Sequence, residues 1–154
     1  DCLLSRGLGD VYKRQHEAVI EQLRSRQQRY TALRRKLVEA LGCAKDPLTI
    51  TDLQRSAKGV ALSSLYRNLA ILEECAVVSR IMTSNGSAIF ELSETLSEHH
   101  HHLVCAKCGL VRDIVVPESI EHGLDQQLMK LARKEGFSFR HHQLDVIGLC
   151  GRCS

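Results

Sequence analysis

Two pairs of cysteines with the same spacing lie in the second half of this chain. Cys105 and Cys108 form one Cys-x-x-Cys turn, and Cys150 and Cys153 form another, with 41 residues between the turns. The spacing lets both thiolates of a turn face one ion, and two such turns complete a tetrahedral sulfur site of the kind that holds structural Zn²⁺. Thiol redox chemistry is the alternative. Because each turn closes a predicted strand of one small domain, we expect a closed structural zinc site without an open coordination position.

Four consecutive histidines, His99–His102, precede the first cysteine pair. Side chains alternate between the two faces of an extended strand, so this run can offer His99 and His101 to one site and His100 and His102 to another. Further ligands for the first site are available in His141, His142, and Glu121 or His122. Three imidazoles and a carboxylate suit Zn²⁺, although Fe²⁺ or Ni²⁺ would accept them. A stray tag or a solvated tract is the alternative, but the run is internal and leads directly into a predicted strand.

Three histidines and a water also make a hydrolytic zinc site, so catalysis is a second hypothesis. The sequence offers no paired general acid and base, no nucleophile motif and no Gly-rich phosphate loop. We therefore expect a binding protein and not an enzyme, with a zinc-dependent hydrolase or a redox protein as the remote alternative.

The net charge of +3 conceals an asymmetry. Residues 16–80 carry eleven Lys/Arg and seven Asp/Glu, a balance of +4, whereas residues 81–154 carry seven and nine, a balance of −2. A basic half followed by a half rich in metal ligands indicates nucleic acid at one end and metal at the other. No apolar run approaches the roughly 20 residues of a membrane span, and no signal peptide is recognisable, so we expect a cytoplasmic protein whose cysteines are metal ligands or thiols.

The second half must therefore position two sets of ligands. We predict strands over His102–Cys105 and Leu110–Val116, then a helix that Ser119 caps and that ends at Gly136. Two more alternating segments, Phe137–His141 and Leu144–Leu149, predict strands that lead to the last cysteine pair.

The first half has the order of a winged helix-turn-helix. After a short amphipathic segment that closes at Leu23, Thr31 can cap a second helix that ends at Gly42. Thr49 or Thr51 can begin a short third helix, and Ser63 can cap a fourth helix over residues 64–75. Strands over Val77–Met82 and Ala88–Leu92 follow, joined by an Asn-Gly turn that is typical of a hairpin. The start of the fourth helix would then face base edges, and basic side chains before it would hold phosphates. The predicted DNA-contacting residues are Arg29, Arg34, Ser64, Tyr66 and Arg67.

Residues 1–15 are expected to be non-native. Residues 10–15 can be back-translated to GATGTGTATAAGAGACAG, which resembles the end of a sequencing adapter, so they are left out of fold reasoning. We divide the rest into a winged-helix DNA-binding domain (16–92), a linker (93–98) and a metal-binding domain (99–154). Cys43 and Cys75 have apolar helical neighbours and are predicted to be core.

Together these residues resemble the ferric uptake regulator (Fur) superfamily from about Gln22 to Cys153. The matching pieces are Arg29-x-Thr31-x-x-Arg34, Ser64-Leu65-Tyr66-Arg67, Phe90-Glu91-Leu92, the His run with Cys105-x-x-Cys108-Gly109, and Gly136-Phe137, His142 and Gly148-Leu149-Cys150-x-x-Cys153. His101 stands where iron regulators of the family often carry Asp, and with this ending the chain looks most like the zinc uptake regulator branch.

The resemblance implies an α+β homodimer, with an N-terminal winged helix-turn-helix and a C-terminal α/β dimerisation domain that holds the four-cysteine zinc site. It also implies a metal-loaded repressor of metal-uptake genes on palindromic operator DNA, responsive to Zn²⁺ or alternatively to Fe²⁺, another metal or peroxide. Carried over from the family, the sensing site falls on His99, His101, Glu121 and His142. A second site falls on Glu91, His100, His102 and Asp113, between the domains. Many members place a histidine of the DNA-binding domain in that second site, where this chain has Asp46-Pro47.

Overall fold

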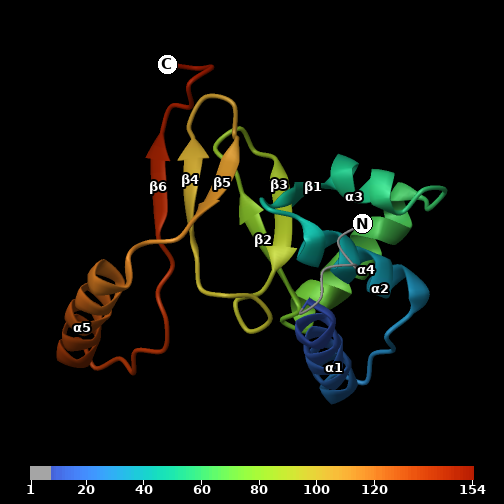
Figure 1. Ribbon diagram of the computed structural model, residues 1–154, viewed down its shortest axis with the longest axis horizontal. Helices are drawn as coiled ribbons and strands as arrows, with labels where there is room; N and C mark the ends of the chain where they lie inside the picture. The colour runs from blue at the N-terminus through green and yellow to red at the C-terminus, as the bar shows by residue number, and fades with distance from the viewer. Residues whose placement is uncertain (1–7) are drawn as a thin grey trace.

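The computed structural model describes residues 8–154 and falls into a helical first half and a smaller second half (Figure 1). The elements of the first half are α1 (Leu8–Ser25), α2 (Ala32–Cys43), β1 (Leu48–Thr49), α3 (Ile50–Ser56), α4 (Leu62–Glu74), β2 (Val78–Met82) and β3 (Ala88–Leu92). Those of the second half are β4 (His101–Cys105), β5 (Val111–Ile114), α5 (Glu118–Lys134) and β6 (Asp145–Gly148). Among the described residues no helix is both long and apolar enough to cross a membrane.

The helices of the first half begin where local capping favours a start. Thr31 caps α2 by accepting a hydrogen bond from the Arg34 amide, and Thr49 caps α3 in a reciprocal capping box with Asp52. Leucines of α2, α3 and α4 then meet in one buried core, represented by Leu37, Leu53 and Leu65, each with 0% of its surface exposed. This core fixes the orientation of α4 relative to α2 and α3.

The turn between α3 and α4 depends on a glycine. Gly59 has φ +81°, in the left-handed region that side chains rarely adopt. The turn ends at Ala61, whose extended backbone places its carbonyl to accept from the amides of Ser64 and Leu65. The predicted cap at Ser63 is therefore wrong, because Leu62 and Ser63 already lie in the first turn of α4.

A β-hairpin follows the helices, and its turn forms the wing of the winged helix. Strands β2 and β3 pair antiparallel from Val78 opposite Leu92 to Met82 opposite Ala88. The short strand β1 pairs with the other edge of β3, which gives the order β1-β3-β2. The hairpin predicted from Asn85-Gly86 is present, whereas β1 was not predicted.

The second half is a three-stranded sheet of order β5-β4-β6 and one helix. Strand β4 pairs antiparallel with β5 and parallel with β6. The N-cap of α5 is Pro117, so the predicted cap at Ser119 is wrong, because Ser119 already lies in the first turn of the helix. Its apolar side chains are not buried in the single chain, and Ile120 and Leu131 are each 59% exposed. Figure 1 shows α5 standing apart from the rest of the chain.

The strand predicted over Phe137–His141 is not present. Residues 137–144 form no strand, and Phe137 is 72% exposed. Alternation of side chains can mark a strand, but a strand also needs a neighbouring strand to pair with, and residues 137–144 pair with none. The prediction that Cys43 belongs to the core is also wrong, because it is exposed, whereas Cys75 is buried.

Several contacts join the two halves, in addition to those among the metal-ligating side chains described below. Ile81 and Ile89 of the hairpin pack with Val104 and Val111 of the second sheet in a small buried cluster. At the wing turn, Ser84 Oγ donates to the carbonyls of Cys105 (3.2 Å) and Ala106 (3.0 Å), and Asn85 Nδ2 donates to the carbonyl of Cys108 (3.2 Å). Asp46 and Arg112 form an ion pair between the halves as well. The wing turn thus rests on the first Cys-x-x-Cys turn.

The N-terminal segment expected to be non-native lies partly within the structure. Residues 1–7 are outside the described residues, while residues 8–15 form the first turns of α1. The side chain of Gln15 donates to the carbonyl of Leu96 at 3.0 Å. The origin of the segment stays a prediction.

Candidate metal centres and nucleic-acid interface

The four predicted sulfur ligands lie together, in what we call the cysteine cluster. One sulfur from each of Cys105, Cys108, Cys150 and Cys153 lies within 4.8 Å of all the others. The parallel pairing of β4 and β6 places Cys105 opposite Gly148, so the two cysteine turns emerge at the same end of the sheet. The four sulfurs surround one point, as a tetrahedral ion requires.

The electrostatics of the cysteine cluster favour a cation at its centre. Backbone amides, first that of Cys108 and then that of Cys150, donate toward Cys105 and lower its pKa to about 6. The neighbouring sulfurs, first that of Cys150, raise the pKa of Cys153 to about 12. Four thiolates therefore repel one another unless a positive ion stabilises them, and zinc binding releases their protons.

The second group of predicted ligands, here called the sensing cluster, consists of His99, His101, Glu121 and His142. Its ligand atoms also lie within 4.8 Å of one another. The Glu121 carboxylate lies among three imidazoles, with its oxygens 3.0 Å from His99 Nε2, 2.9 Å from His101 Nε2 and 3.0 Å from His142 Nε2. Hydrogen bonding from His101 lowers the pKa of Glu121. All three rings thus turn the same nitrogen toward one point.

An orphaned nitrogen indicates that the sensing cluster fits a metal ion. His142 Nε2 is buried and makes no hydrogen bond, although it lies 3.0 Å from a Glu121 oxygen. A buried polar atom without a partner is unfavourable, and a metal ion on the same lone pair would satisfy it. Three imidazole nitrogens and one carboxylate oxygen are a donor set that zinc accepts in tetrahedral geometry.

The third group, the hinge cluster, joins the two halves. Glu91 comes from β3, His100 precedes β4, His102 lies on β4 and Asp113 on β5. A single oxygen of Glu91 lies 3.2 Å from His100 Nε2 and 3.0 Å from His102 Nε2. The Asp113 oxygens lie 3.9 Å and 3.8 Å from the same two nitrogens. A metal bound here would tie the winged-helix hairpin to the second sheet.

Charges in the hinge cluster balance one another in the absence of an ion. The hydrogen bond to Glu91 raises the pKa of His102 to about 9. Burial opposes ionisation of Glu91, but hydrogen bonds from His102 and His100 lower its pKa overall. Burial raises the pKa of Asp113, whose Oδ1 is buried without a hydrogen bond. The donor set of two imidazoles and two carboxylates fits a divalent cation.

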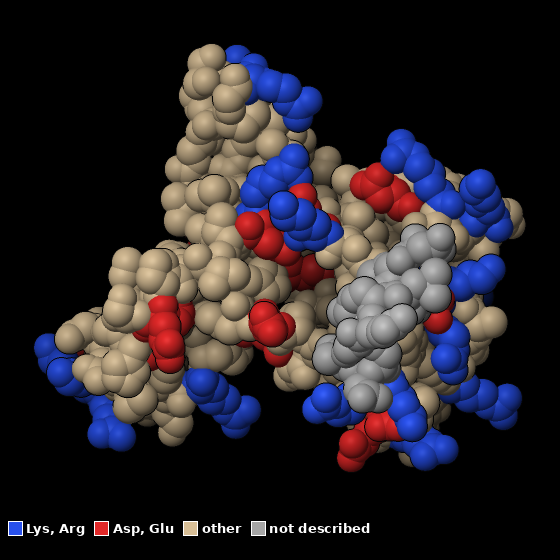
Figure 2. All heavy atoms as spheres, viewed as in Figure 1, with Lys and Arg blue, Asp and Glu red and all other residues tan. Residues whose placement is uncertain are grey.

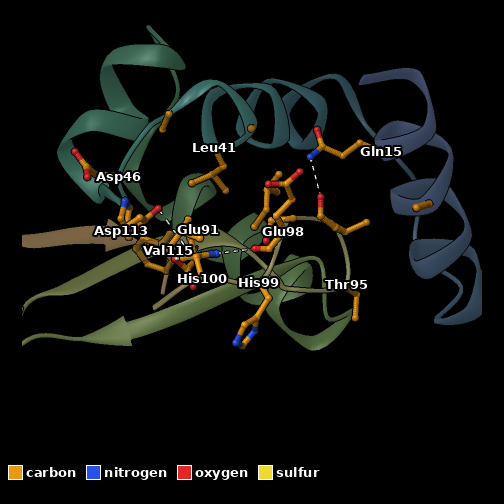
Figure 3. A pocket seen from close by; sticks show the side chains of 18 of the residues that line it. Gln15, Leu41, Asp46, Glu91, Thr95, Glu98, His99, His100, Asp113 and Val115 are labelled. Atoms are coloured by element: carbon orange, nitrogen blue, oxygen red, sulfur yellow. Dashed lines mark hydrogen bonds and ion pairs between the residues drawn. The ribbon is translucent and has the colours of Figure 1, made fainter. Parts of the chain in front are cut away.

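Asp46 lies at the margin of the hinge cluster. It lines a cavity of about 670 Å³ together with Glu91, His100 and Asp113, and Figure 3 shows Asp46 and Asp113 on the same side of this cavity. Its carboxylate pairs with Arg112 and contributes to the raised pKa of Asp113. The position where the family resemblance led us to expect a histidine thus holds an acid that is already paired. Figure 2 shows acidic side chains gathered where the halves meet.

Sequence reasoning missed a set of carboxylates behind the histidines. Asp125 Oδ1 lies 2.9 Å from His142 Nδ1, and Asp145 Oδ1 lies 3.1 Å from His102 Nδ1. Asp125 follows Glu121 by four residues on α5, a spacing that places both on one helix face and was visible in the sequence. The pairing of Asp145 with His102 depends on the register of β4 and β6, which the sequence does not reveal.

The predicted DNA-contacting residues do not share one environment. On α4, Tyr66 is 49% exposed, Arg67 is exposed and Ser64 is half-buried. Arg29 is exposed on the segment before α2. Figure 2 shows Lys and Arg side chains around the outer edge of the winged-helix half. These positions suit a surface that receives a phosphate backbone.

Arg34 differs from the expected role of a phosphate contact. It is only 6% exposed. Its guanidinium donates to Asn68 Oδ1 at 3.0 Å, to the carbonyl of Arg29 at 2.6 Å and to Gln28 Oε1 at 3.3 Å. Because Asn68 is on α4, this side chain holds α4 and the segment before α2 together. A direct bond to phosphate would require these hydrogen bonds to break.

A winged helix-turn-helix joined to a domain with three groups of metal-ligating side chains defines a metal-responsive, DNA-binding transcriptional regulator. Residues 25–147 match the model of the Ferric uptake regulator family, and the chain belongs to this family. Members of the family are dimeric transcriptional repressors and not enzymes. The predicted fold class and regulator class are thereby confirmed.

Individual relatives differ in what they are named for. The chain is 36% identical over 101 residues to the "Ferric uptake regulation protein" of Legionella pneumophila, a match that covers 66% of this chain and 69% of that one. It is 27% identical over 139 residues to the "Peroxide operon regulator" of Bacillus subtilis (strain 168), covering 88% and 90%. The crystal structure of the Vibrio cholerae ferric uptake regulator is similar with a TM-score of 0.65 and 25% identity, covering 85% of this chain and 98% of that one.

Proposed function

We propose that this chain is a zinc-responsive repressor of metal-uptake genes, which binds palindromic operator DNA as a homodimer. The observation that carries the zinc assignment is the sensing cluster, in which three Nε2 atoms and one carboxylate converge. Zinc accepts four such ligands in tetrahedral geometry, whereas Mn²⁺ favours oxygen ligands in octahedral geometry.

We assign a structural zinc ion to the cysteine cluster. Its four thiolates leave no open position for a substrate or a nucleophile. In a half with only a small buried cluster, a bound zinc supplies stability that the core lacks, on the order of 10 kcal/mol in small zinc peptides. Cys150→Ser should therefore lose about one tightly bound zinc per chain together with dimerisation or solubility. Disulfides and no zinc in freshly reduced, active protein, detected by mass spectrometry, would favour the redox hypothesis instead.

An iron-responsive repressor is the second candidate, and a specific observation favours it. The hinge cluster offers two carboxylates with its two imidazoles, and harder ions prefer such oxygen ligands. The Legionella relative is named for ferric uptake. The Bacillus subtilis relative is named for a peroxide operon. The two clusters thus point to different metals, and only one of them needs to control DNA binding.

We assign base recognition to the start of α4 and phosphate binding to the segment before α2. Tyr66 and Ser64 would contact base edges, Arg67 a guanine or a phosphate, and Arg29 a phosphate. Arg34 would act by positioning α4 through Asn68 rather than by touching DNA. A dimer should need half-sites one helical turn apart, about 34 Å.

The exposed apolar surface of the second half supports a homodimer. Ile120 and Leu131 of α5 and Ile147 of β6 are 59%, 59% and 70% exposed in the single chain. Exposed apolar surface of this extent marks an interface. We assign α5 and β6, and hence residues 99–154, to dimerisation, and residues 16–92 to DNA binding with 93–98 as the linker.

The deciding experiment is operator binding by protein that retains only the zinc of its cysteine cluster, titrated with Zn²⁺, Fe²⁺, Mn²⁺ and Ni²⁺ under reducing, anaerobic conditions. We expect Zn²⁺ to raise DNA affinity at the lowest free concentration. Activation by Fe²⁺ at lower free concentration than Zn²⁺ would replace the zinc proposal with the iron one. Binding to no duplex with any metal present would refute the repressor itself.

A further inference from the structure

Two enclosed histidine rings, one in each histidine cluster, lie between two carboxylates. In the sensing cluster, the His142 ring has Glu121 at Nε2 (3.0 Å) and Asp125 at Nδ1 (2.9 Å). In the hinge cluster, the His102 ring has Glu91 at Nε2 (3.0 Å) and Asp145 at Nδ1 (3.1 Å). In both cases Nε2 faces the predicted ligands of the cluster, and the outer carboxylate belongs to neither ligand set.

The fold supplies these outer carboxylates from rigid elements. Asp125 lies one turn after Glu121 on α5, so one face of this helix places a carboxylate at each nitrogen of the His142 ring. Asp145 is the direct cross-strand partner of His102 in the parallel pairing of β4 and β6. The rings themselves are enclosed, since 8% of the His142 side chain and 2% of the His102 side chain are exposed. The rings therefore cannot turn freely, whereas Asp125 (43% exposed) and Asp145 (41%) are reached by water.

A metal ion needs a neutral imidazole whose ligating nitrogen has its lone pair free. A carboxylate at Nδ1 accepts the Nδ1 hydrogen, which leaves Nε2 without a proton and fixes the orientation of the ring. The same contact makes Nε2 a stronger donor to the metal. We propose that Asp125 and Asp145 are positioning residues that set the tautomer and orientation of His142 in the sensing cluster and of His102 in the hinge cluster.

None of the other histidines of the two clusters has a carboxylate as close to its Nδ1. His100 Nδ1 contacts the carbonyl of Glu98 at 2.8 Å, and His101 Nδ1 is buried without a hydrogen bond. His99 Nδ1 lies 3.3 Å from Glu94 at an exposed position. The histidines that depend on an outer carboxylate are therefore His142 and His102, one for each cluster. Each site can be weakened separately without changing any predicted ligand.

The test measures metal affinity and tautomer in the full chain, and it rests on the ligand sets of the proposed function. Asp125→Asn and Asp145→Asn are compared with Glu118→Gln, which removes the same charge from the exposed first turn of α5. Zn²⁺ affinity is measured by chelator competition in reduced protein that retains the zinc of its cysteine cluster. We expect Asp125→Asn to weaken the sensing cluster about 10–100-fold and to leave the hinge cluster unchanged, Asp145→Asn to do the reverse, and Glu118→Gln to change neither.

The imidazole ¹⁵N shifts provide a second readout that a purely structural role would not move. In protein without added metal, at a pH above 9 where the His102 ring is neutral, we expect loss of the hydrogen at Nδ1 of His142 in Asp125→Asn, and of His102 in Asp145→Asn, while circular dichroism stays unchanged. If both variants keep wild-type affinity and tautomers while His142→Ala and His102→Ala lose metal, the positioning roles are wrong and the ligand sets stand. If wild-type protein binds no zinc beyond the ion of the cysteine cluster, both the ligand sets and the positioning roles are refuted.

Discussion

The contact between the wing turn and the first cysteine turn can be tested at one glycine. Gly109 follows Cys108 and has φ +71°, and a Cβ added there would lie 2.7 Å from Asn85 Nδ2 and 2.9 Å from Asn85 Cγ. Gly109→Ala therefore meets two penalties. The first is backbone strain in the left-handed region, about 1–2 kcal/mol. The second is displacement of Asn85, whose bond to the Cys108 carbonyl contributes about 0.5–1.5 kcal/mol.

Gly136 provides a matched control for the strain alone. It has φ +78°, and a Cβ added there would have nothing within 4 Å. We therefore expect Gly136→Ala to lower the free energy of unfolding by about 1–2 kcal/mol and Gly109→Ala by about 2–3 kcal/mol. Replacing Asn85 with Ala removes the clashing atoms. In that background Gly109→Ala should cost only the strain, which gives a coupling of about 1 kcal/mol between the two positions.

The assay is urea unfolding of reduced, zinc-saturated protein, followed by far-ultraviolet circular dichroism, for both single variants, Asn85→Ala and the double variant. Hydrogen exchange at residues 83–87 reports the wing turn directly, and it should become faster in Gly109→Ala but not in Gly136→Ala. Equal costs at the two glycines with zero coupling to Asn85 would show that the wing turn does not rest on the cysteine turn in solution.

Three further predictions concern the metal clusters and the DNA surface. His101→Ala should leave a folded, zinc-containing dimer whose DNA affinity, measured by fluorescence anisotropy, no longer rises the roughly 5–150-fold that such coupling typically gives; unchanged zinc activation would pass the sensing role to the hinge cluster. Tyr66→Ala should cost about 1–3 kcal/mol of operator binding and relax sequence preference, whereas Arg29→Ala should weaken all sequences and flatten the salt dependence by about one unit of slope, and salt-independent binding by the wild type would contradict both. Glu91 raises the folded-state pKa of His102 from 6.5 to about 9. In protein lacking the hinge metal, the stabilisation from this pair is therefore full below about pH 6.5 and is lost as the pH rises through 9. The urea midpoint should fall over this pH range in the wild type and fall less in His102→Gln, and an equal pH dependence of the two midpoints would refute the pair.

Local signals in the sequence were sufficient for most helix starts and for the wing. Thr31 and Thr49 cap their helices through their own side chains, so the prediction needed no knowledge of the rest of the fold. The start of α4 was misplaced because Ala61 supplies only a backbone carbonyl, and no side chain marks it. The absent strand at Phe137–His141 illustrates the opposite error, since alternation is a local signal whereas pairing with another strand is not.

The three metal clusters could be grouped in advance because each depends on a short-range rule. Cys-x-x-Cys turns converge by spacing, and the alternation of the histidine run separates its two faces. Partners that depend on register could not be found this way. Asp145 meets His102 only because β6 pairs parallel with β4, and Arg34 is withdrawn from the surface only because Asn68 of α4 reaches it.

The distribution of ligands between the halves limits how metal can control DNA binding. All four residues of the sensing cluster belong to the second half, so an ion there can order α5 and the histidine run but does not itself contact the DNA-binding half. The hinge cluster includes Glu91 of β3, and the cysteine turn holds the wing through Ser84 and Asn85. A coupling of about 1–3 kcal/mol is sufficient for typical allosteric regulation, and a few partly exposed hydrogen bonds supply that amount. We therefore expect the sensing cluster to act through the same contacts that Gly109→Ala disturbs, so that this variant should reduce zinc activation even with every metal ligand intact.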